Sequence, residues 1–286
     1  MKGNLYAMIT SQSSNKYTSI ALDTFFRTTK LSNNDEIVLI DNDNEGTYNH
    51  PNIIKNLVPK SFASNCNAMI EYAQGRNLVI LSNDIAFTPE WNLPLIGYSN
   101  ALLLPSCNQT HLYNVGNLQL KSSMQIEDYN GRYQELTVIS QQHKSQVKGL
   151  FENLLMAFYA FSLPPNVYDQ VGYFDESFGI GGGEDVDYRV RSIEKNIPVK
   201  YNSQSYLLHF AGKSTWDGPE KQKEIEERNK KYFSKFIEKW GEDLANFCLV
   251  GGNPVPVVEK YQLHDYIKTQ EYSRAIKAIL NISNRN

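Results

Sequence analysis

Short runs of hydrophobic residues alternate with helix-like stretches along the first hundred residues. Residues 5–10, 36–40 and 77–81 are apolar on both faces, which is typical of strands buried in a parallel sheet. Residues 17–28 and 64–74 carry apolar side chains at helical spacing, and the second stretch stops at a glycine. This alternation predicts an α/β fold in which helices flank a mostly parallel central sheet.

The second half of the chain is less regular. Residues 108–148 are polar and show little periodicity, so we expect an irregular excursion that could serve as a lid. Further on, the pattern predicts a helix at 186–194, short strands at 198–201 and 205–209, and helices at 220–240 and 261–280. We interpret the charges of the helix at 220–240 as a solvated face. One continuous domain with a helical tail is expected.

Composition narrows the class of protein. The chain has 286 residues, of which 41% are hydrophobic and 21% are charged, which excludes a disordered chain. A net charge of −3 argues against general coating of nucleic acid. Three cysteines lie far apart, and the sequence shows no secretory signal and no membrane-spanning run. We therefore expect a cytoplasmic protein with reduced thiols.

Acidic residues follow the predicted strands at one edge of the sheet. Asp41 and Asp84 each come directly after a buried strand, where ligands of α/β sheets bind. An isolated aspartate at such a place can equally close a turn or cap a helix. His209 ends a predicted strand and could be a metal ligand, although a lone histidine is more often structural. Aspartates and a histidine, with diphosphate oxygens, would suit Mn²⁺ or Mg²⁺.

A glycine-rich segment leads into a group of acids. Three glycines at 181–183 precede Glu184 and Asp185 at the predicted start of a helix, where the helix dipole favours negative charge. Simple capping therefore stands as an alternative to catalysis for both acids. Asp187 is four residues from Arg191, and we interpret this pair as structural. The segment lacks the Gly-Lys-[Ser/Thr] ending of a phosphate loop.

The acidic segment and its surroundings resemble the GT-A glycosyltransferases of the family-2 type. Residues 171–178 (VGYFDESF) and 184–191 (EDVDYRVR) are similar to that family's G-x-F-D-E-x-F…E-D-V-D-x-x-x-R signature. Residues 206–209 (YLLH) resemble its strand that ends in histidine. The approach GGGED is also similar to the acceptor-binding G-G-E-D loop of galactosyltransferase-type enzymes. In all, the resemblance covers roughly residues 3–216.

On the N-terminal side the resemblance rests on three further segments. Residues 37–42 (IVLIDN) resemble the family's strand that ends in a nucleotide-binding aspartate, and residues 62–67 (FASNCN) resemble the segment before its donor-site helix. Residues 81–84 (LSND) occupy the place of its D-x-D motif. The first acid of that motif is replaced by Ser82, so Asp84 alone would face a metal from this loop.

The resemblance implies a domain organisation and a reaction. It implies a GT-A domain at 1–216, with a donor half at about 1–106 and an acceptor half at about 149–216, and a helical C-terminal extension at 217–286. The implied reaction is metal-dependent transfer from a nucleotide diphosphate sugar, most commonly a UDP-sugar, to an acceptor hydroxyl with inversion. A glycan is the default acceptor, and a protein side chain or a hydroxylated nucleobase is an alternative.

The resemblance also implies roles for single residues. Asp185 would be the general base, Glu184 would position the acceptor or share that role, and Asp84 and His209 would hold Mn²⁺ or Mg²⁺. The acceptor loop would comprise Gly182, Gly183 and Glu184. Donor-binding residues would be Thr10, Asp41, Asn67 and Asn83, although Asn67 could serve only as a cap.

Two other classes of function compete with this reading of the residues. A nucleotidyltransferase that forms sugar nucleotides shares the sheet plan but opens with a glycine-rich basic loop, and residues 10–16 contain no glycine. A catalytically inactive carbohydrate-binding protein on the same scaffold is left open by Ser82. The intact Asp84, Glu184, Asp185 and His209 argue against it.

Overall fold

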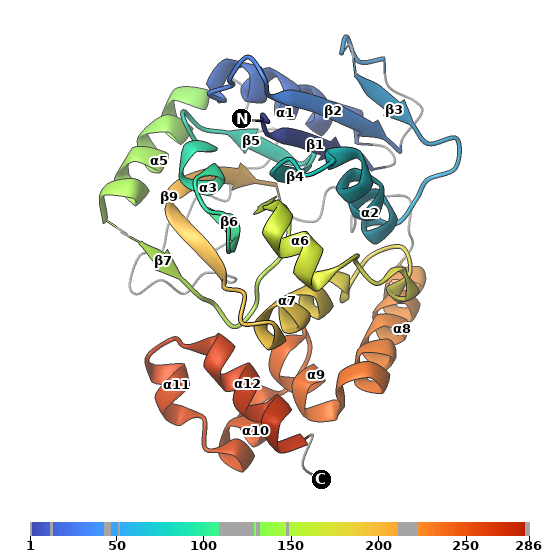
Figure 1. Ribbon diagram of the computed structural model, residues 1–286, viewed down its shortest axis with the longest axis vertical. Coiled ribbons are helices and arrows are strands. Elements are labelled where there is room, and N and C mark those ends of the chain that lie inside the picture. Colours follow the sequence, from blue (N-terminus) through green and yellow to red (C-terminus); the bar gives the residue numbers. More distant parts are fainter. Residues whose placement is uncertain are drawn as a thin grey trace.

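A computed structural model describes residues 2–11, 14–42, 47–50, 52–108, 129, 132–146, 149–210 and 222–283. Within them, nine strands form one sheet in the order β3-β2-β1-β4-β8-β6-β9-β5, and β7 pairs with β9 (Figure 1). The strands are β1 (Leu5–Ile9), β2 (Glu36–Asp41), β3 (Ile53–Lys55), β4 (Leu78–Ser82), β5 (Ile85–Phe87), β6 (Leu102–Cys107), β7 (Leu150–Phe151), β8 (Ala160–Leu163) and β9 (Val199–His209).

Helices flank this sheet and continue beyond it. They are α1 (Asn15–Thr28), α2 (Phe62–Ala73), α3 (Leu93–Ile96), α5 (Tyr133–Gln146), α6 (Pro165–Val171), the 3₁₀ helix η1 (Glu176–Phe178), α7 (Glu184–Glu194), α8 (Gln222–Trp240), α9 (Glu242–Cys248), α10 (Pro254–Tyr261), α11 (His264–Lys268) and α12 (Tyr272–Ser283). Helix α1 packs against β5, and α2 packs against β1 and β4. The α/β class predicted from the sequence is confirmed.

The first three predicted strands, β1, β2 and β4, run parallel to one another. β1 runs parallel to β2 on one side and to β4 on the other, so that Ile9 lies opposite both Ile40 and Ser82. All five residues of β1 are buried, as its continuous apolar run predicts. β8 is antiparallel to β4 and to β6, while β6 and β9 are parallel. The carboxyl ends of β1, β2 and β4 therefore meet at one edge.

The two short strands expected at 198–201 and 205–209 are one continuous strand, β9. The polar residues between them suggest a turn, but their side chains are satisfied inside the fold. Ser203 Oγ donates to the carbonyl of Gly149 at 3.0 Å, and Ser205 Oγ donates to the carbonyl of Trp91 at 2.6 Å. Because these polar groups find backbone partners, the strand continues through them.

The polar stretch at 108–148 was expected to be irregular, but part of what the structure describes of it is a helix. Residues 133–146 form the helix α5, which packs against β9. Its apolar side chains are few and its buried face includes Ser140 and His143, so the hydrophobic pattern gives little sign of a helix. The expected lid otherwise falls outside the described residues.

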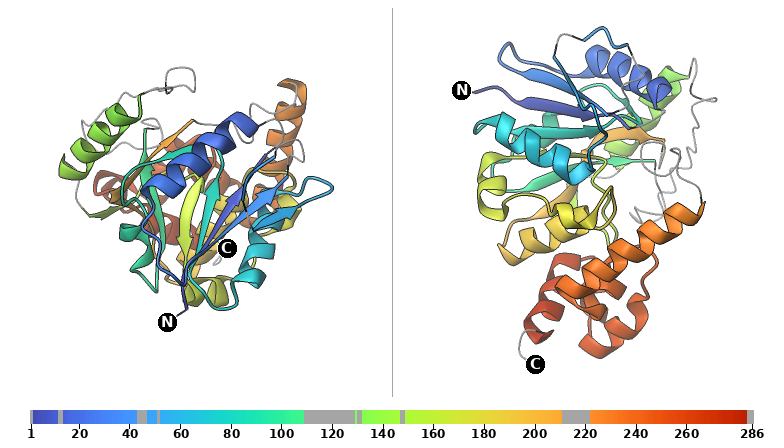
Figure 2. Two further views of the ribbon diagram at one scale, coloured as in Figure 1. Left: turned by 90° about the horizontal axis from the view of Figure 1, so that it is seen from above. Right: turned by 90° about the vertical axis from the view of Figure 1, so that its right-hand side faces the viewer.

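The C-terminal helices enclose a second hydrophobic cluster beneath the sheet (Figure 2). Side chains of α8, α9, α10 and α12 pack there against Val190 and Ile193 of α7. The helix expected at 261–280 is in fact α11 and α12, and the chain turns between them at Gln270, whose φ is 57°. The expected domain boundary at residue 216 lies outside the described residues. No helix in the described ranges has the length and apolar character needed to cross a membrane.

Candidate active site

Thr10 and Asp41 meet at the edge where β1 and β2 end. The Thr10 hydroxyl donates to Asp41 Oδ1 at 3.4 Å and accepts a hydrogen bond from the backbone N–H of Asn42 at 2.9 Å. Both side chains are buried, with exposed fractions of 2% and 0%. The parallel register of β1 and β2 brings these two predicted donor residues together.

The two asparagines expected at the donor site, Asn67 and Asn83, both make hydrogen bonds within the fold. The Asn83 side-chain amide donates to the hydroxyls of Ser14 and Thr18, both at 2.7 Å, and so fixes the start of α1. The Asn67 amide donates to the carbonyl of Phe174 and to Glu176, and its Oδ1 accepts the N–H of Phe174. These bonds tie α2 to the 174–176 segment. Contact of either asparagine with a donor stays a prediction.

Asp84 and His209 form a buried pair at the same edge. β5 begins directly after Asp84 and pairs with the end of β9, so that Ile85 lies opposite His209. His209 Nε2 lies 3.5 Å from Asp84 Oδ1, and that same oxygen accepts a hydrogen bond from Ser82 Oγ at 2.6 Å. Ser82, which replaces the first acid of the D-x-D pattern, therefore orients the second one.

The charge of Asp84 determines the pKa of His209. Burial alone would lower the pKa of His209, but the charge of Asp84 and hydrogen bonds to Asp84 and Cys107 outweigh it and raise the pKa to about 10. The imidazole also stacks on the ring of Tyr159, with centroids 4.5 Å apart. The negative charge of Asp84 thus favours the protonated form of His209, and a metal ion bound between them would take the place of that proton.

The pair offers a divalent cation two protein ligands. In the described part of the chain, no three Asp, Glu, His or Cys side chains converge on a possible metal position. A carboxylate and an imidazole fit Mn²⁺ or Mg²⁺ when the substrate's phosphate oxygens and water complete the coordination. Asp84 and His209 suit that arrangement because both are buried within contact of each other.

The glycine-rich segment places two acids at the start of α7. Gly182 and Gly183 have φ values of 113° and 88°, a backbone region that residues with a side chain rarely adopt. Glu184 is 5% exposed, and its Oε2 has no hydrogen-bond partner among the described residues. Burial, and then the charge of Asp185, raise the pKa of Glu184. A buried carboxylate with a free oxygen is a candidate for binding a ligand hydroxyl.

Asp185 is half-buried and accepts two backbone hydrogen bonds. Its Oδ1 accepts the N–H of Val186 at 2.8 Å, and its Oδ2 accepts the N–H of Phe158 at 3.4 Å. Burial raises the pKa of Asp185, and these backbone bonds oppose the rise. The structure thus adds positioning by Phe158 to the helix-start placement expected from the sequence.

The residues just before β8 link the two acidic centres. The N–H of Phe158 bonds Asp185, and the ring of the next residue, Tyr159, stacks on His209. The expected metal ligands and the expected base therefore converge on adjacent residues of one segment. Nothing in the sequence singles out these two aromatic residues, because they read as part of an apolar run.

Helix α8 contributes two further residues that sequence reasoning missed. Arg228 Nη1 donates to the carbonyl of Gly181 at 3.2 Å, and the ring of Tyr232 lies against Gly182 and Gly183. The charged face of this helix was expected to be solvated, but Arg228 and Tyr232 are buried. Asp187 and Arg191 do form the expected structural pair, at 2.9 Å.

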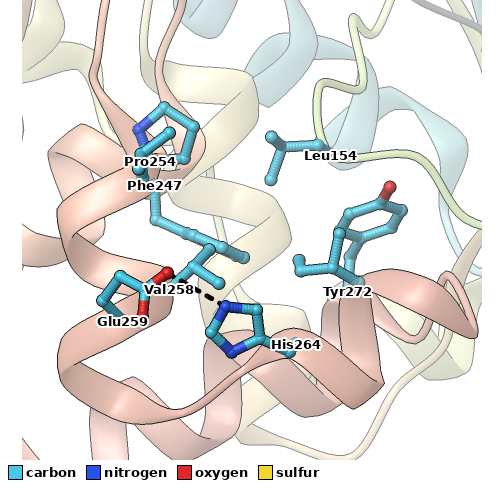
Figure 3. Close-up of a pocket in the computed structure, with 9 residues that line it drawn as sticks. Leu154, Phe247, Pro254, Val258, Glu259, His264 and Tyr272 are labelled. Atoms are coloured by element: carbon cyan, nitrogen blue, oxygen red, sulfur yellow. Dashed lines mark hydrogen bonds and ion pairs between the residues drawn. The ribbon is translucent and has the colours of Figure 1, made fainter.

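A separate apolar pocket of about 320 Å³ lies among the C-terminal helices (Figure 3). Leu154, Phe247, Val258 and Tyr272 line it, and the Glu259–His264 pair stands at its rim with 3.1 Å between Nε2 and Oε1. None of the expected site residues reaches this pocket. The acidic centres at the sheet edge are the better candidate for chemistry.

Comparison with known proteins places the fold. No protein-family model and no curated protein sequence matches the chain. A crystal structure of GalNAc-T7 with UDP, GalNAc and Mn²⁺ is similar at a TM-score of 0.59 and 13% identity, over 86% of this chain and 49% of that chain. The mannosyltransferase PcManGT from Pyrobaculum calidifontis, in complex with GDP-Man and Mn²⁺, is similar at a TM-score of 0.52 and 11% identity, over 98% of this chain and 86% of that chain.

The aligned region covers different shares of these two proteins. This chain spans about half the length of the GalNAc-T7 chain and most of the length of the mannosyltransferase. At such low identity the likeness speaks for the fold alone. It agrees with the mixed sheet, the flanking helices and the C-terminal helices described above. The chain has the GT-A fold of glycosyltransferases.

Proposed function

We propose that this protein is a metal-dependent glycosyltransferase. It moves a sugar from a nucleotide diphosphate sugar, with UDP-sugars as the first candidates, to an acceptor hydroxyl with inversion. The observation that carries the proposal is the meeting of two polar pairs at residues 158–159: Tyr159 stacks on His209 beside Asp84, and Phe158 bonds Asp185 beside Glu184. The glycosyltransferases that share the fold were solved with Mn²⁺ and a nucleotide or nucleotide sugar.

The leaving group needs positive charge. Mn²⁺ or Mg²⁺, when bound, supplies the charge that stabilises the departing nucleoside diphosphate. Asp84 and His209 would hold it, with Ser82 orienting the carboxylate through its 2.6 Å hydrogen bond. Thr10 and Asp41 would contact the nucleoside, because the ends of β1 and β2 lie at the edge where ligands of such sheets bind.

The acceptor needs a base. Asp185 takes the proton of the acceptor hydroxyl while that oxygen forms a bond to the anomeric carbon. The bond from the anomeric carbon to the diphosphate oxygen breaks at the same time, and its electron pair leaves with the nucleoside diphosphate. Attack from the side opposite the leaving group inverts the anomeric centre. The raised pKa of Asp185 makes it a stronger base than an exposed aspartate.

Glu184 positions the acceptor in this scheme. Its buried Oε2 lacks a hydrogen-bond partner among the described residues and can accept a bond from an acceptor hydroxyl. Gly182 and Gly183 would complete the acceptor loop: their positive φ values shape the turn into α7, and the ring of Tyr232 packs where their side chains would lie. The acceptor class is a glycan by default, with a protein side chain or a hydroxylated nucleobase as the alternatives.

A donor panel tests the proposal. UDP-glucose, UDP-galactose, UDP-GalNAc and GDP-mannose are each incubated with the protein and Mn²⁺, Mg²⁺ or excess chelator. We expect at least one donor to raise the melting temperature and to be hydrolysed slowly, with water as the acceptor, only when metal is present. Stabilisation without turnover indicates an inactive carbohydrate-binding protein. Formation of a sugar nucleotide from a sugar phosphate and a nucleoside triphosphate indicates a nucleotidyltransferase.

A further inference from the structure

Helix α8 packs two side chains from consecutive turns onto the glycine loop. Arg228 is 9% exposed, and its Nη1 donates a hydrogen bond to the Gly181 carbonyl at 3.2 Å. A Cβ built on Gly182 would lie 2.7 Å from Cδ1 of Tyr232, and one on Gly183 would lie 3.3 Å from Cδ2 of the same ring. The tyrosine ring therefore covers both glycines. This helix follows the region in which the chain resembles a known family.

The far end of α8 is fixed to the same part of the fold. Lys239 Nζ lies 2.7 Å from Asp175 Oδ2 and 2.8 Å from Asp187 Oδ1, and Trp240 Nε1 donates to Asp187 Oδ1 at 2.8 Å. Arg228 and Lys239 are eleven residues apart, which is about 16 Å along a helix. With contacts at both places, α8 is a rigid support for the glycine loop.

The positive charge of Arg228 also acts on the Glu184 carboxyl. The titratable and charged groups around Glu184 are Asp185 of its own helix, Arg228 and Tyr232 of α8, and the buried thiol of Cys66 on α2. Burial and then the charge of Asp185 raise the pKa of Glu184, and the charge of Arg228 opposes that rise. Among these groups of the described residues, Arg228 is the cation.

We propose that Arg228 is a positioning residue of the acceptor site, which holds the glycine loop through the Gly181 carbonyl and favours the charged form of Glu184. This inference rests on the glycosyl transfer proposed above for the identity of the acceptor. A charged Glu184 accepts a hydrogen bond from a hydroxyl, whereas a protonated one can donate instead. Helix α8 is then part of the catalytic unit and not an appendage to it.

Four variants separate charge from packing. Arg228→Met removes the charge and the hydrogen bond, Arg228→Gln removes the charge but can still donate to Gly181, and Arg228→Lys keeps the charge. Lys230→Met is the matched control, because Lys230 is exposed on the same helix and its loss changes the net charge equally. If Arg228→Met does not fold, Arg228→Gln decides the question in its place.

The first measurement needs no substrate. The protein is labelled with ¹³C at the side-chain carboxyl carbon of glutamate, and its NMR signals are titrated with pH, with Glu184→Gln used to assign the signal. We expect Glu184 in Arg228→Met and Arg228→Gln to titrate at least about one pH unit higher than in the wild type, since a nearby opposite charge shifts a carboxyl by roughly 1–3. Arg228→Lys keeps the charge, so its Glu184 should titrate close to the wild-type pH. Superimposable titrations in all variants overturn the proposal.

The second measurement is the pH dependence of donor hydrolysis. The rate of hydrolysis of UDP-glucose, UDP-galactose, UDP-GalNAc and GDP-mannose is followed against pH with Mn²⁺. The rising limb of the profile should move to higher pH in Arg228→Met and return in Arg228→Lys, while Lys230→Met matches the wild type. An active Arg228→Met with an unshifted profile contradicts the role of Arg228. A wild type that turns over no donor contradicts the proposed function, and the NMR titration still decides the role of Arg228.

Discussion

Replacing Lys239 should weaken the contacts that hold the end of α8 against Asp175 and Asp187. Its ammonium group contacts Asp175 at 2.7 Å and the fully buried Asp187 at 2.8 Å. Burial alone would raise the pKa of Asp175, but hydrogen bonds from Lys239 and Ser177 outweigh it and lower the pKa to about 2. Lys239→Met keeps the length of the side chain and removes its charge, so it isolates the ionic contacts.

The size of the effect follows from these contacts. A fall in the pKa of Asp175 from 3.8 to about 2 corresponds to roughly 2 kcal/mol, of which Ser177 keeps a part when Lys239 is lost. Asp187 keeps Arg191 and Trp240 as partners, so the loss of its contact with Lys239 adds only about 1 kcal/mol. We therefore expect Lys239→Met to lower the free energy of unfolding by about 2 kcal/mol and the melting temperature by about 3–4 °C.

Urea denaturation at two pH values tests this reasoning. Because the folded-state pKa of Asp175 lies below its unfolded value, its stabilisation is complete above about pH 4 and is lost as the pH falls toward 2. The difference between wild type and Lys239→Met should be full at pH 7 and smaller near pH 3. Lys235→Met, which loses only an exposed pair with Glu238, should cost less than about 0.5 kcal/mol. Equal losses for both variants at pH 7 would refute the argument.

Three further predictions concern the two halves of the site. Excess chelator should abolish turnover and Mn²⁺ should restore it, and Asp84→Ala should weaken donor binding measured calorimetrically with Mn²⁺ present; full activity in chelator argues against the metal pair. Asp41→Ala should raise the KM for the donor more than it lowers kcat, because the nucleoside is remote from the bond that breaks; an unchanged donor KM counts against its place in the donor pocket. Gly182→Ala should lower the melting temperature and the turnover, since its φ is +113° and the new Cβ would lie 2.7 Å from Tyr232, whereas Gly97→Ala, with open space around it, should leave turnover unchanged.

The sheet and the strand-end acids could be predicted because they depend on local pattern. The strands at 5–10, 36–40 and 77–81 are continuous apolar runs, and the structure reproduces them to within a residue at each end. Parallel pairing then brings the ends of β1, β2 and β4 together without further information. The Asp84–His209 contact arises in a related way, since both residues stand at the ends of strands.

Other features depend on tertiary contacts that pattern does not encode. The polar side chains of β9 bond to distant carbonyls, such as that of Trp91, so a segment that reads as a turn is a strand. Asn67 and Asn83 hold backbone and helix ends together, which their place in the sequence does not reveal. Arg228 is one of many charges on an amphipathic helix, and only packing against the glycine loop distinguishes it.

The Asp185→Asn variant decides whether Asp185 is the base of an inverting sugar transfer. Asparagine caps a helix about as well as aspartate but takes up no proton near neutral pH, so the fold and the donor affinity should be kept. The measurement is kcat for metal-dependent donor turnover, with melting temperature and donor binding measured on the same preparations. We expect a loss of at least about 10²-fold in kcat for Asp185→Asn, and a raised acceptor KM for Glu184→Gln. Near-normal turnover in Asp185→Asn together with an inactive Glu184→Gln would contradict it and exchange the two roles.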